Sequence, residues 1–163
     1  VTSLAKFIHQ QFDTRITWER VEQMATSWNG PFAIKGLLAP EDARRAVDSG
    51  ATAIIVSNHG GRQLDGAVAP FDVLERIVDA VGDRAEVILD GGVRRGSHVV
   101  KALAQGASAC MVGRPYLFGL GAGGEAGVER ALTILRQETQ RALQLSGCRR
   151  PEELDRSYLQ RLR

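Results

Sequence analysis

The chain has 163 residues, of which 44% are hydrophobic and 25% are charged, as in one ordinary globular domain. A formal net charge of +2 is too small to indicate a nucleic-acid-binding surface. Two isolated cysteines, Cys110 and Cys148, provide neither a disulfide framework nor a metal-ligand cluster, so we expect no metal. The sequence contains no run of eighteen apolar residues, so we expect no transmembrane helix. We expect a cytoplasmic location, and peripheral membrane association is compatible with it.

Short apolar strands alternate with amphipathic helices along the chain. Proline opens two of the helices, glycine closes three, and we expect Ser97 to cap the helix that it begins. The predicted elements are a helix over 17–28, a strand over 32–35, a helix from Pro40 to Gly50, a strand over 52–56, a helix from Pro70 to Gly82, a strand over 86–89, a helix from Ser97 to Gly106, a strand over 108–112 and a long helix over about 125–146. The remaining residues form a polar tail that we expect to dock elsewhere.

This alternation predicts a parallel sheet with right-handed crossovers, and the apolar strands indicate burial on both faces. Either a doubly wound open sheet or half of an eight-stranded (β/α)8 TIM barrel fits. A full barrel needs roughly 250 residues. Every strand ends in a polar, Gly-rich stretch, and barrel active sites lie at that carboxyl end. We therefore predict an α/β fold, strands 5–8 of a barrel, with residues 14–148 as the barrel part of one domain and 149–163 as the tail.

Two neighbouring strand ends carry glycine together with arginine. Asp90-Gly91-Gly92-Val93-Arg94-Arg95-Gly96-Ser97 links a strand to a helix, and Gly113-Arg114-Pro115 follows the next strand. Glycines let the backbone approach a ligand closely, and a helix N-terminus with Arg94 or Arg95 attracts an anion. A turn with surface arginines is the simpler alternative. Barrels frequently bind phosphate between the loops after strands 7 and 8, so we favour a phosphate site.

The first two strand ends provide a base and cations. Lys35 ends its strand at a position where its charge needs a partner, either a structural carboxylate or an anionic ligand atom. The turn 57–64 combines His59 with Arg62. Arginine binds a carboxylate through two parallel hydrogen bonds, and an imidazole exchanges its proton near neutral pH. A merely structural histidine is the alternative for His59, whereas His9 and His98, in helical contexts without a partner motif, are expected to be ordinary.

These motifs resemble the C-terminal half of the FMN-dependent α-hydroxy-acid dehydrogenases and oxidases, a family that includes glycolate oxidase, L-lactate dehydrogenase and (S)-mandelate dehydrogenase. The segments that carry the resemblance occur in the family's order and approximate spacing within residues 14–148, and they are Ile34-Lys35-Gly36, Ser57-Asn58-His59-Gly60-Gly61-Arg62-Gln63, Asp90 to Gly96 and Gly113-Arg114-Pro115.

The resemblance implies a role for each residue. As catalytic residues, Lys35 would stabilise reduced FMN at its N1/O2 edge, His59 would be the base, and Arg62 would hold the substrate carboxylate. The residues implied in cofactor binding are Lys35, Ser57, which would hydrogen-bond the flavin, Asp90, Gly91, Gly92 and Val93, which would line the ribityl-phosphate site, and Arg94, Gly113 and Arg114, which would hold the phosphate. The implied reaction oxidises a small (S)-2-hydroxy acid to its 2-oxo acid.

The family's N-terminal half is absent from this sequence, so the resemblance implies activity only together with that half. We expect it as a separate chain or segment in the same particle, and we expect a homo-oligomer, a tetramer by resemblance. Two other functions stay open. One is another phosphate- or FMN-binding barrel enzyme similar to IMP dehydrogenase, and the other is a flavin-binding half-barrel without catalysis.

Overall fold

The computed structural model of the chain describes residues 7, 13 and 15–160. Its sheet consists of four parallel strands, β1 (Ala33–Leu37), β2 (Ala53–Val56), β3 (Glu86–Asp90) and β4 (Ala109–Met111), in the order β1-β2-β3-β4. The order in the sheet is therefore the order in the chain. A doubly wound sheet reverses direction at a switch point, and this sheet has none.

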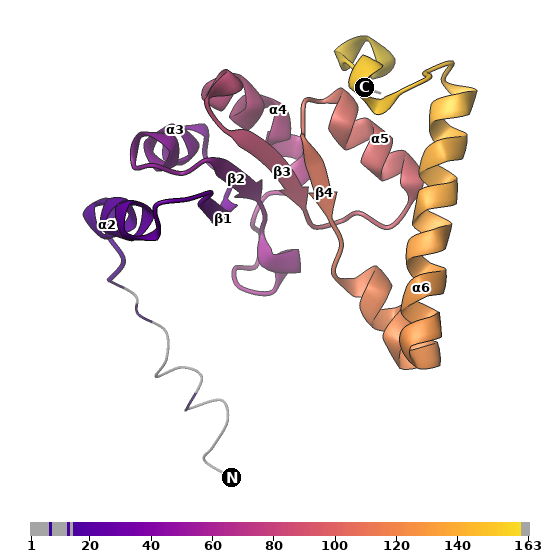
Figure 1. Cartoon of the computed structure of the whole chain (residues 1–163), viewed down its shortest axis with the longest axis horizontal. Helices are drawn as coiled ribbons and strands as arrows, with labels where there is room; N and C mark the ends of the chain where they lie inside the picture. Colours follow the sequence, from indigo (N-terminus) through magenta and orange to yellow (C-terminus); the bar gives the residue numbers. More distant parts are fainter. Residues whose placement is uncertain (1–6, 8–12, 14, 161–163) are drawn as a thin grey trace.

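The helices lie in an arc along one side of this sheet (Figure 1). They are α2 (Trp18–Trp28), α3 (Pro40–Asp48), α4 (Pro70–Val81), α5 (Gly96–Ala104) and α6 (Arg114–Leu145). Parallel strands added one after another in the same direction place every crossover helix on the same face. That arrangement is the winding of a barrel wall, which confirms the prediction of strands and helices from a (β/α)8 barrel.

The core lies between the sheet and this layer of helices. Ile54 and Val56 of β2 are fully buried, whereas Ala53 and Ile55, which point to the other face, are only partly buried. Strand β3 repeats this pattern. The predicted burial on both faces is therefore wrong for the described chain, because its helices cover only one face. The apolar side chains of the other face would become buried only against further polypeptide.

The start of α5 differs from the sequence-based prediction. Ser97 lies inside the helix, and Arg95 is the N-cap residue, whose side chain makes no capping hydrogen bond to the helix terminus. The Gly96 N–H donates instead to Oε2 of Glu138 on α6 at 2.9 Å. A Cβ atom on Gly96 would overlap the backbone of Glu138 and Thr139, so glycine is what lets α5 and α6 approach. A distant carboxylate satisfies the helix terminus, which explains why a local capping pattern missed it.

Helix α6 begins at Arg114, shortly after β4 ends at Met111 and well before the predicted start at residue 125. The backbone leaves the helical conformation at Gly123 and Gly124, and the two arms pack so closely that a Cβ on Gly119 would meet the backbone of Gly127. The first arm was not predicted, because its glycines have a low intrinsic preference for helix.

The described part of the polar tail, up to residue 160, docks on this chain's own helices. It contains two short 3-10 helices, η3 (Pro151–Glu153) and η4 (Arg156–Tyr158). Arg156 forms ion pairs with Asp79 and Glu75 of α4, the latter at 3.7 Å. Among the described helices, none has both the length and the apolar character that a membrane span requires.

We predict that Gly96→Ala lowers the free energy of unfolding by about 1–3 kcal/mol, because the added methyl group would push α5 away from the backbone of α6. Thermal or urea unfolding measures the change. Gly121→Ala is the matched control, because nothing lies within 4 Å of a Cβ at Gly121. That control should be neutral or slightly stabilising, and equal effects of the two substitutions would contradict the packing described here.

Candidate active site

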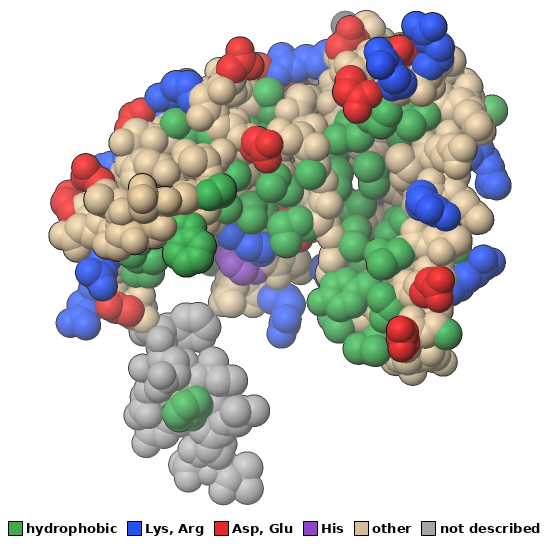
Figure 2. Space-filling view, in the orientation of Figure 1, with side chains coloured by type: hydrophobic (Ala, Val, Ile, Leu, Met, Phe, Trp, Pro, Cys, Tyr) green, Lys and Arg blue, Asp and Glu red, His purple; other side chains and the backbone are tan. Residues whose placement is uncertain are grey.

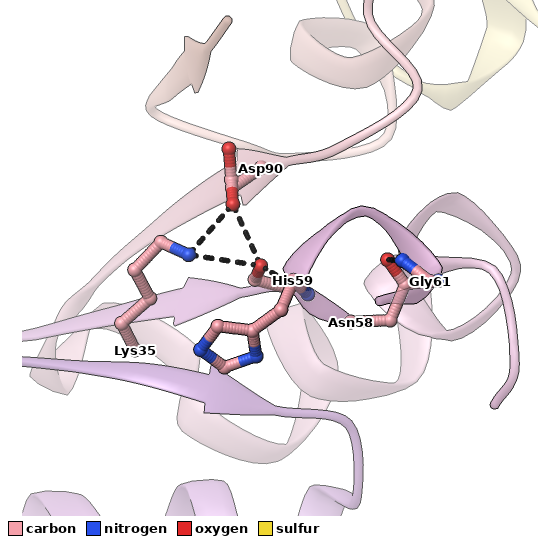
Figure 3. Close-up of polar contacts among 6 residues, drawn as sticks. Lys35, Asn58, His59, Gly61 and Asp90 are labelled. Carbon is pink, nitrogen blue, oxygen red and sulfur yellow. Dashed lines mark hydrogen bonds and ion pairs between the residues drawn. The ribbon is translucent and has the colours of Figure 1, made fainter. Parts of the chain in front are cut away.

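The carboxyl ends of β1, β2 and β3 are joined by one polar network (Figure 3). Lys35 Nζ lies 2.9 Å from Asp90 Oδ2 and 3.1 Å from Ser57 Oγ, and Ser57 Oγ lies 2.6 Å from Asp90 Oδ2. Lys35 lies in β1, Ser57 follows β2 by one residue and Asp90 ends β3, and the parallel pairing of the three neighbouring strands brings these residues together despite a register shift after Lys35. The network fixes the lysine that the sequence selected and adds a structural carboxylate as its partner.

The hydroxyl of Ser57 is saturated by these contacts. It donates to Asp90, accepts from Lys35, and also accepts the backbone N–H of His59 at 3.0 Å. A serine hydroxyl has one donor and two acceptor positions. Ser57 is also fully buried. The predicted hydrogen bond from Ser57 to the flavin stays a prediction, and in this arrangement the side chain serves to hold Lys35 and the His59 turn.

The charges of the network determine the ionisation of Asp90. Burial acts to raise the pKa of this carboxyl group, but hydrogen bonds from Lys35 and Ser57, together with the electrostatic effects of Lys35 and of the neighbouring His59, lower it below its ordinary value of 3.8. Asp90 is therefore a carboxylate at neutral pH. The Asp90 side chain is 16% exposed and that of Lys35 is 37% exposed, so the ammonium group still has an open side.

The turn after β2 has an unusual backbone. His59, Gly60 and Gly61 all have left-handed φ values, of 56°, 70° and 73°, and such values are uncommon for a histidine. The Asn58 side chain accepts the Gly61 N–H at 3.2 Å and donates to the Val68 carbonyl at 3.3 Å, which holds the turn at two points. The sequence predicted a turn with glycines but not the strain at His59.

The His59 ring folds back over the end of β1. A Cβ atom on Gly36 would lie 2.7 Å from His59 Cε1, so any side chain there would displace the ring. Arg62 ends the same turn, is exposed, and forms no ion pair or side-chain hydrogen bond within the described part of the chain. The base and the cation predicted from the motif thus lie on one turn, and both side chains are accessible to a ligand.

The loop after β3 separates its two arginines. Arg95 lies 3.5 Å from Glu138 Oε1, so this guanidinium is directed to α6. Arg94 is exposed and its guanidinium has no ion pair within residues 15–160. Gly91 and Gly92 have φ values of 105° and 77°, which other residues rarely adopt, and Val93 is buried. Between the two candidates, the structure leaves Arg94 free to bind an anion.

The loop after β4 reaches back to the His59 turn. The Arg114 Nη2 group donates to the Gly60 carbonyl at 3.1 Å, and a Cβ on Gly60 would lie 2.9 Å from it. Gly113 is the N-cap residue of α6, and nothing lies within 4 Å of a Cβ there. The residues predicted to bind phosphate and substrate therefore lie together at the carboxyl end of the sheet. Figure 2 shows basic side chains beside a histidine in a hollow of this molecule.

The residues at the carboxyl end of the sheet fit a flavin mononucleotide. A phosphate needs cations and N–H donors, and this end offers Arg94, Arg114 and the N–H groups of Gly92 and Val93, which donate to no backbone carbonyl among the described residues. The Lys35 ammonium offers a positive charge to an electron-rich ring edge. Sequence reasoning missed His98, whose ring contacts the loop after β3. His9 lies outside the described residues.

We predict that Asp90→Asn lowers the free energy of unfolding by about 1–3 kcal/mol at pH 7, because Lys35 loses its charged partner. Since folding lowers the pKa of Asp90, its stabilisation is complete above the ordinary value of 3.8 and is lost as the pH falls through the folded-state value. The difference between wild type and variant should therefore shrink below about pH 3.8. Urea unfolding across pH measures it, with the exposed Asp65→Asn as control. A difference independent of pH would contradict the ionised pair.

Comparison with known proteins identifies the family of this chain. The sequence model described as FMN-dependent dehydrogenase matches residues 1–161. The chain is 48% identical to L-lactate oxidase of Nostoc sp. over 158 residues, which cover 97% of this chain and 43% of that protein. It is 57% identical to pre-mycofactocin synthase of Mycolicibacterium smegmatis over 120 residues, which cover 74% of this chain and 30% of that protein.

Solved structures show the same fold. The monotopic membrane protein (S)-mandelate dehydrogenase superimposes with a TM-score of 0.91 at 44% identity, covering 96% of this chain and 41% of that one. A mandelate oxidase variant with (S)-mandelic acid gives 0.83 at 50% identity, covering 86% and 42%. The chain thus spans less than half the length of the relatives that it matches. The match over almost all of the sequence shows that this chain belongs to the FMN-dependent dehydrogenase family.

Proposed function

We propose that this chain supplies the FMN phosphate site, the catalytic base and the carboxylate-binding arginine of an enzyme that oxidises a small (S)-2-hydroxy acid to the 2-oxo acid. The observation that carries the proposal is that residues from the carboxyl ends of all four strands come together, through the Lys35–Ser57–Asp90 network and the Arg114–Gly60 hydrogen bond. Family membership and the lactate, glycolate and mandelate enzymes among the relatives support it.

When bound, FMN would supply the acceptor for the two electrons that the substrate loses in the proposed reaction. Arg62 binds the substrate carboxylate through paired hydrogen bonds, and its accessible guanidinium is suited to that. His59 removes a proton from the substrate. The turn and Gly36 position the His59 ring over the end of β1. Lys35 presents a positive charge on the same side, held by Asp90 and Ser57.

The phosphate of FMN is assigned to the loops after β3 and β4. Arg94 and Arg114 provide the charge, Gly91, Gly92 and Gly113 provide close approach of the backbone, and Asp90 and Val93 fix the base of the first loop. This assignment names the residues of this chain that would bind the phosphate of the family's cofactor. It leaves Arg95 outside the site, because Arg95 is paired with Glu138.

A second candidate substrate follows from the comparisons. Identity to pre-mycofactocin synthase is 57%, higher than the 48% to L-lactate oxidase, although it covers a shorter stretch. The same base and flavin could then act on the precursor that pre-mycofactocin synthase uses. The non-catalytic half-barrel is the remaining alternative, and family membership favours the FMN enzymes over an IMP dehydrogenase-like barrel.

We infer that the N-terminal half of the same protein completes the barrel. Within the described residues, β1 pairs only with β2 and β4 only with β3, so both sheet edges are open. Unpaired edges and a half-covered apolar face are stabilised by further strands. Large hydrophobic side chains near the β4 edge are also exposed, among them Met111, Leu117 and Phe118. Assembly into a homo-oligomer, by resemblance a tetramer, is part of this proposal.

We predict that His59→Asn slows anaerobic reduction of bound FMN by a 2-hydroxy acid by about 10²–10⁴, the usual contribution of a positioned base, while FMN binding is retained. Stopped-flow absorbance with lactate, glycolate, mandelate and the pre-mycofactocin synthase precursor measures the rates and identifies the substrate. Asp65→Asn, an exposed change in the same loop, should reduce normally. Near-normal reduction in His59→Asn would remove the histidine from this role, and no reduction by any substrate in the wild type would favour the non-catalytic half-barrel.

We predict that active material contains a second polypeptide segment that closes the sheet. Denaturing gel electrophoresis and native mass spectrometry of the flavin-bound particle should reveal that segment together with this chain, and the native mass should give the oligomeric state. An FMN-bound, catalytically active particle that consists only of residues 1–163 would contradict the inference.

A further inference from the structure

The ring of His98 lies against the loop that we assign to the phosphate. His98 is in the first turn of α5, and its side chain is half-buried. Its Nδ1 atom lies 3.3 Å from the Arg94 backbone nitrogen and 3.2 Å from the Gly92 carbonyl oxygen. One ring atom thus contacts a donor and an acceptor of the same loop, on the two sides of Val93.

The chemistry of imidazole makes this contact directional. A neutral ring that carries no proton on Nδ1 accepts the Arg94 N–H, whereas a ring protonated at Nδ1 donates to the Gly92 carbonyl. In either form the ring ties the loop backbone to the first turn of α5. The loop needs such a tie, because Gly91 and Gly92 have left-handed conformations and glycine has the largest backbone freedom to lose.

The other end of the loop is held independently. Glu138 of α6 accepts the Gly96 N–H at 2.9 Å and lies 3.5 Å from Arg95. With His98 at Gly92 and Arg94, the two contacts fix the loop at both ends and leave the Arg94 side chain between them without a partner in the described chain. The loop is therefore arranged before any ligand arrives, which lowers the ordering cost of binding.

We propose that His98 is a positioning residue that holds the Gly91–Arg94 loop in the conformation that receives the FMN phosphate. The proposal rests on the proposed function, in which this loop binds that phosphate. It does not require His98 to touch the ligand. A role limited to the stability of α5 is the competing explanation, and the geometry provides a way to separate the two.

The test uses three substitutions that differ in which ring nitrogen they mimic. In His98→Asn the amide atoms occupy the place of Nδ1, so both loop contacts can be kept. In His98→Gln the amide lies one carbon further out, near the place of Nε2, and His98→Ala removes the group altogether. Lys101→Ala is the control, since Lys101 is exposed one turn later on the same helix.

We expect Kd for FMN, measured by quenching of flavin fluorescence, to rise about three- to tenfold in His98→Ala and His98→Gln, the factor that loss of one hydrogen bond produces. His98→Asn and Lys101→Ala should bind FMN like the wild type. At saturating FMN, kcat for the 2-hydroxy acid should be unchanged in all four. Thermal unfolding of each variant reports any separate effect on α5.

Equal Kd values in His98→Ala and Lys101→Ala would overturn the proposal, and so would His98→Asn binding as weakly as His98→Gln. If the alanine variant does not fold, the comparison of asparagine with glutamine decides alone. Arg94→Ala distinguishes failure of the underlying function. If Arg94→Ala binds FMN normally, the phosphate does not bind at this loop, whereas weak binding in Arg94→Ala with normal binding in His98→Ala overturns only the role of His98.

Discussion

The buried hydroxyl of Ser57 connects an ammonium group, a carboxylate and the backbone of the His59 turn. Each of its three hydrogen-bonding positions is occupied, and each partner comes from a different part of the site. This one side chain contributes to the position of Lys35, to the lowered pKa of Asp90, where the hydrogen bond from Lys35 is the larger cause, and to the entry into the His59 turn. Because this hydroxyl is buried and all of its hydrogen-bonding positions are occupied, moving it would leave buried polar groups unsatisfied, and the contact therefore orders the site.

The rest of the site is arranged around that network by contacts between loops. Arg114 links the loop after β4 to the His59 turn, and Glu138 and His98 hold the loop after β3. Glycines permit these approaches where a side chain would clash, at Gly36 against His59 and at Gly96 against α6. The proposed function therefore depends on the backbone as much as on the charged side chains, and the open strand edges support the proposal that further polypeptide completes the barrel.

Local sequence patterns predicted most of the fold, because proline, glycine and helical spacing mark the elements from Trp18 to Met111 within one or two residues. They failed where distant contacts decide the outcome. The cap of α5 comes from Glu138, far along the chain, and the first arm of α6 forms despite glycines that disfavour helix. The motifs selected the candidate site residues, but they could not show that Ser57 joins Lys35 to Asp90, that Arg95 pairs with Glu138, or that His98 contacts the loop.

The central claim is that the carboxyl end of the sheet holds FMN, with its phosphate at the loops after β3 and β4 and its ring near Lys35. A crystal structure of the FMN-bound protein tests this claim most directly. We predict that the phosphate oxygens lie within hydrogen-bonding distance of Arg94, Arg114 and the backbone N–H groups of the Gly91–Val93 loop, while Lys35 Nζ contacts the flavin ring. A phosphate bound away from both loops, or a flavin ring remote from Lys35 and His59, would contradict the account.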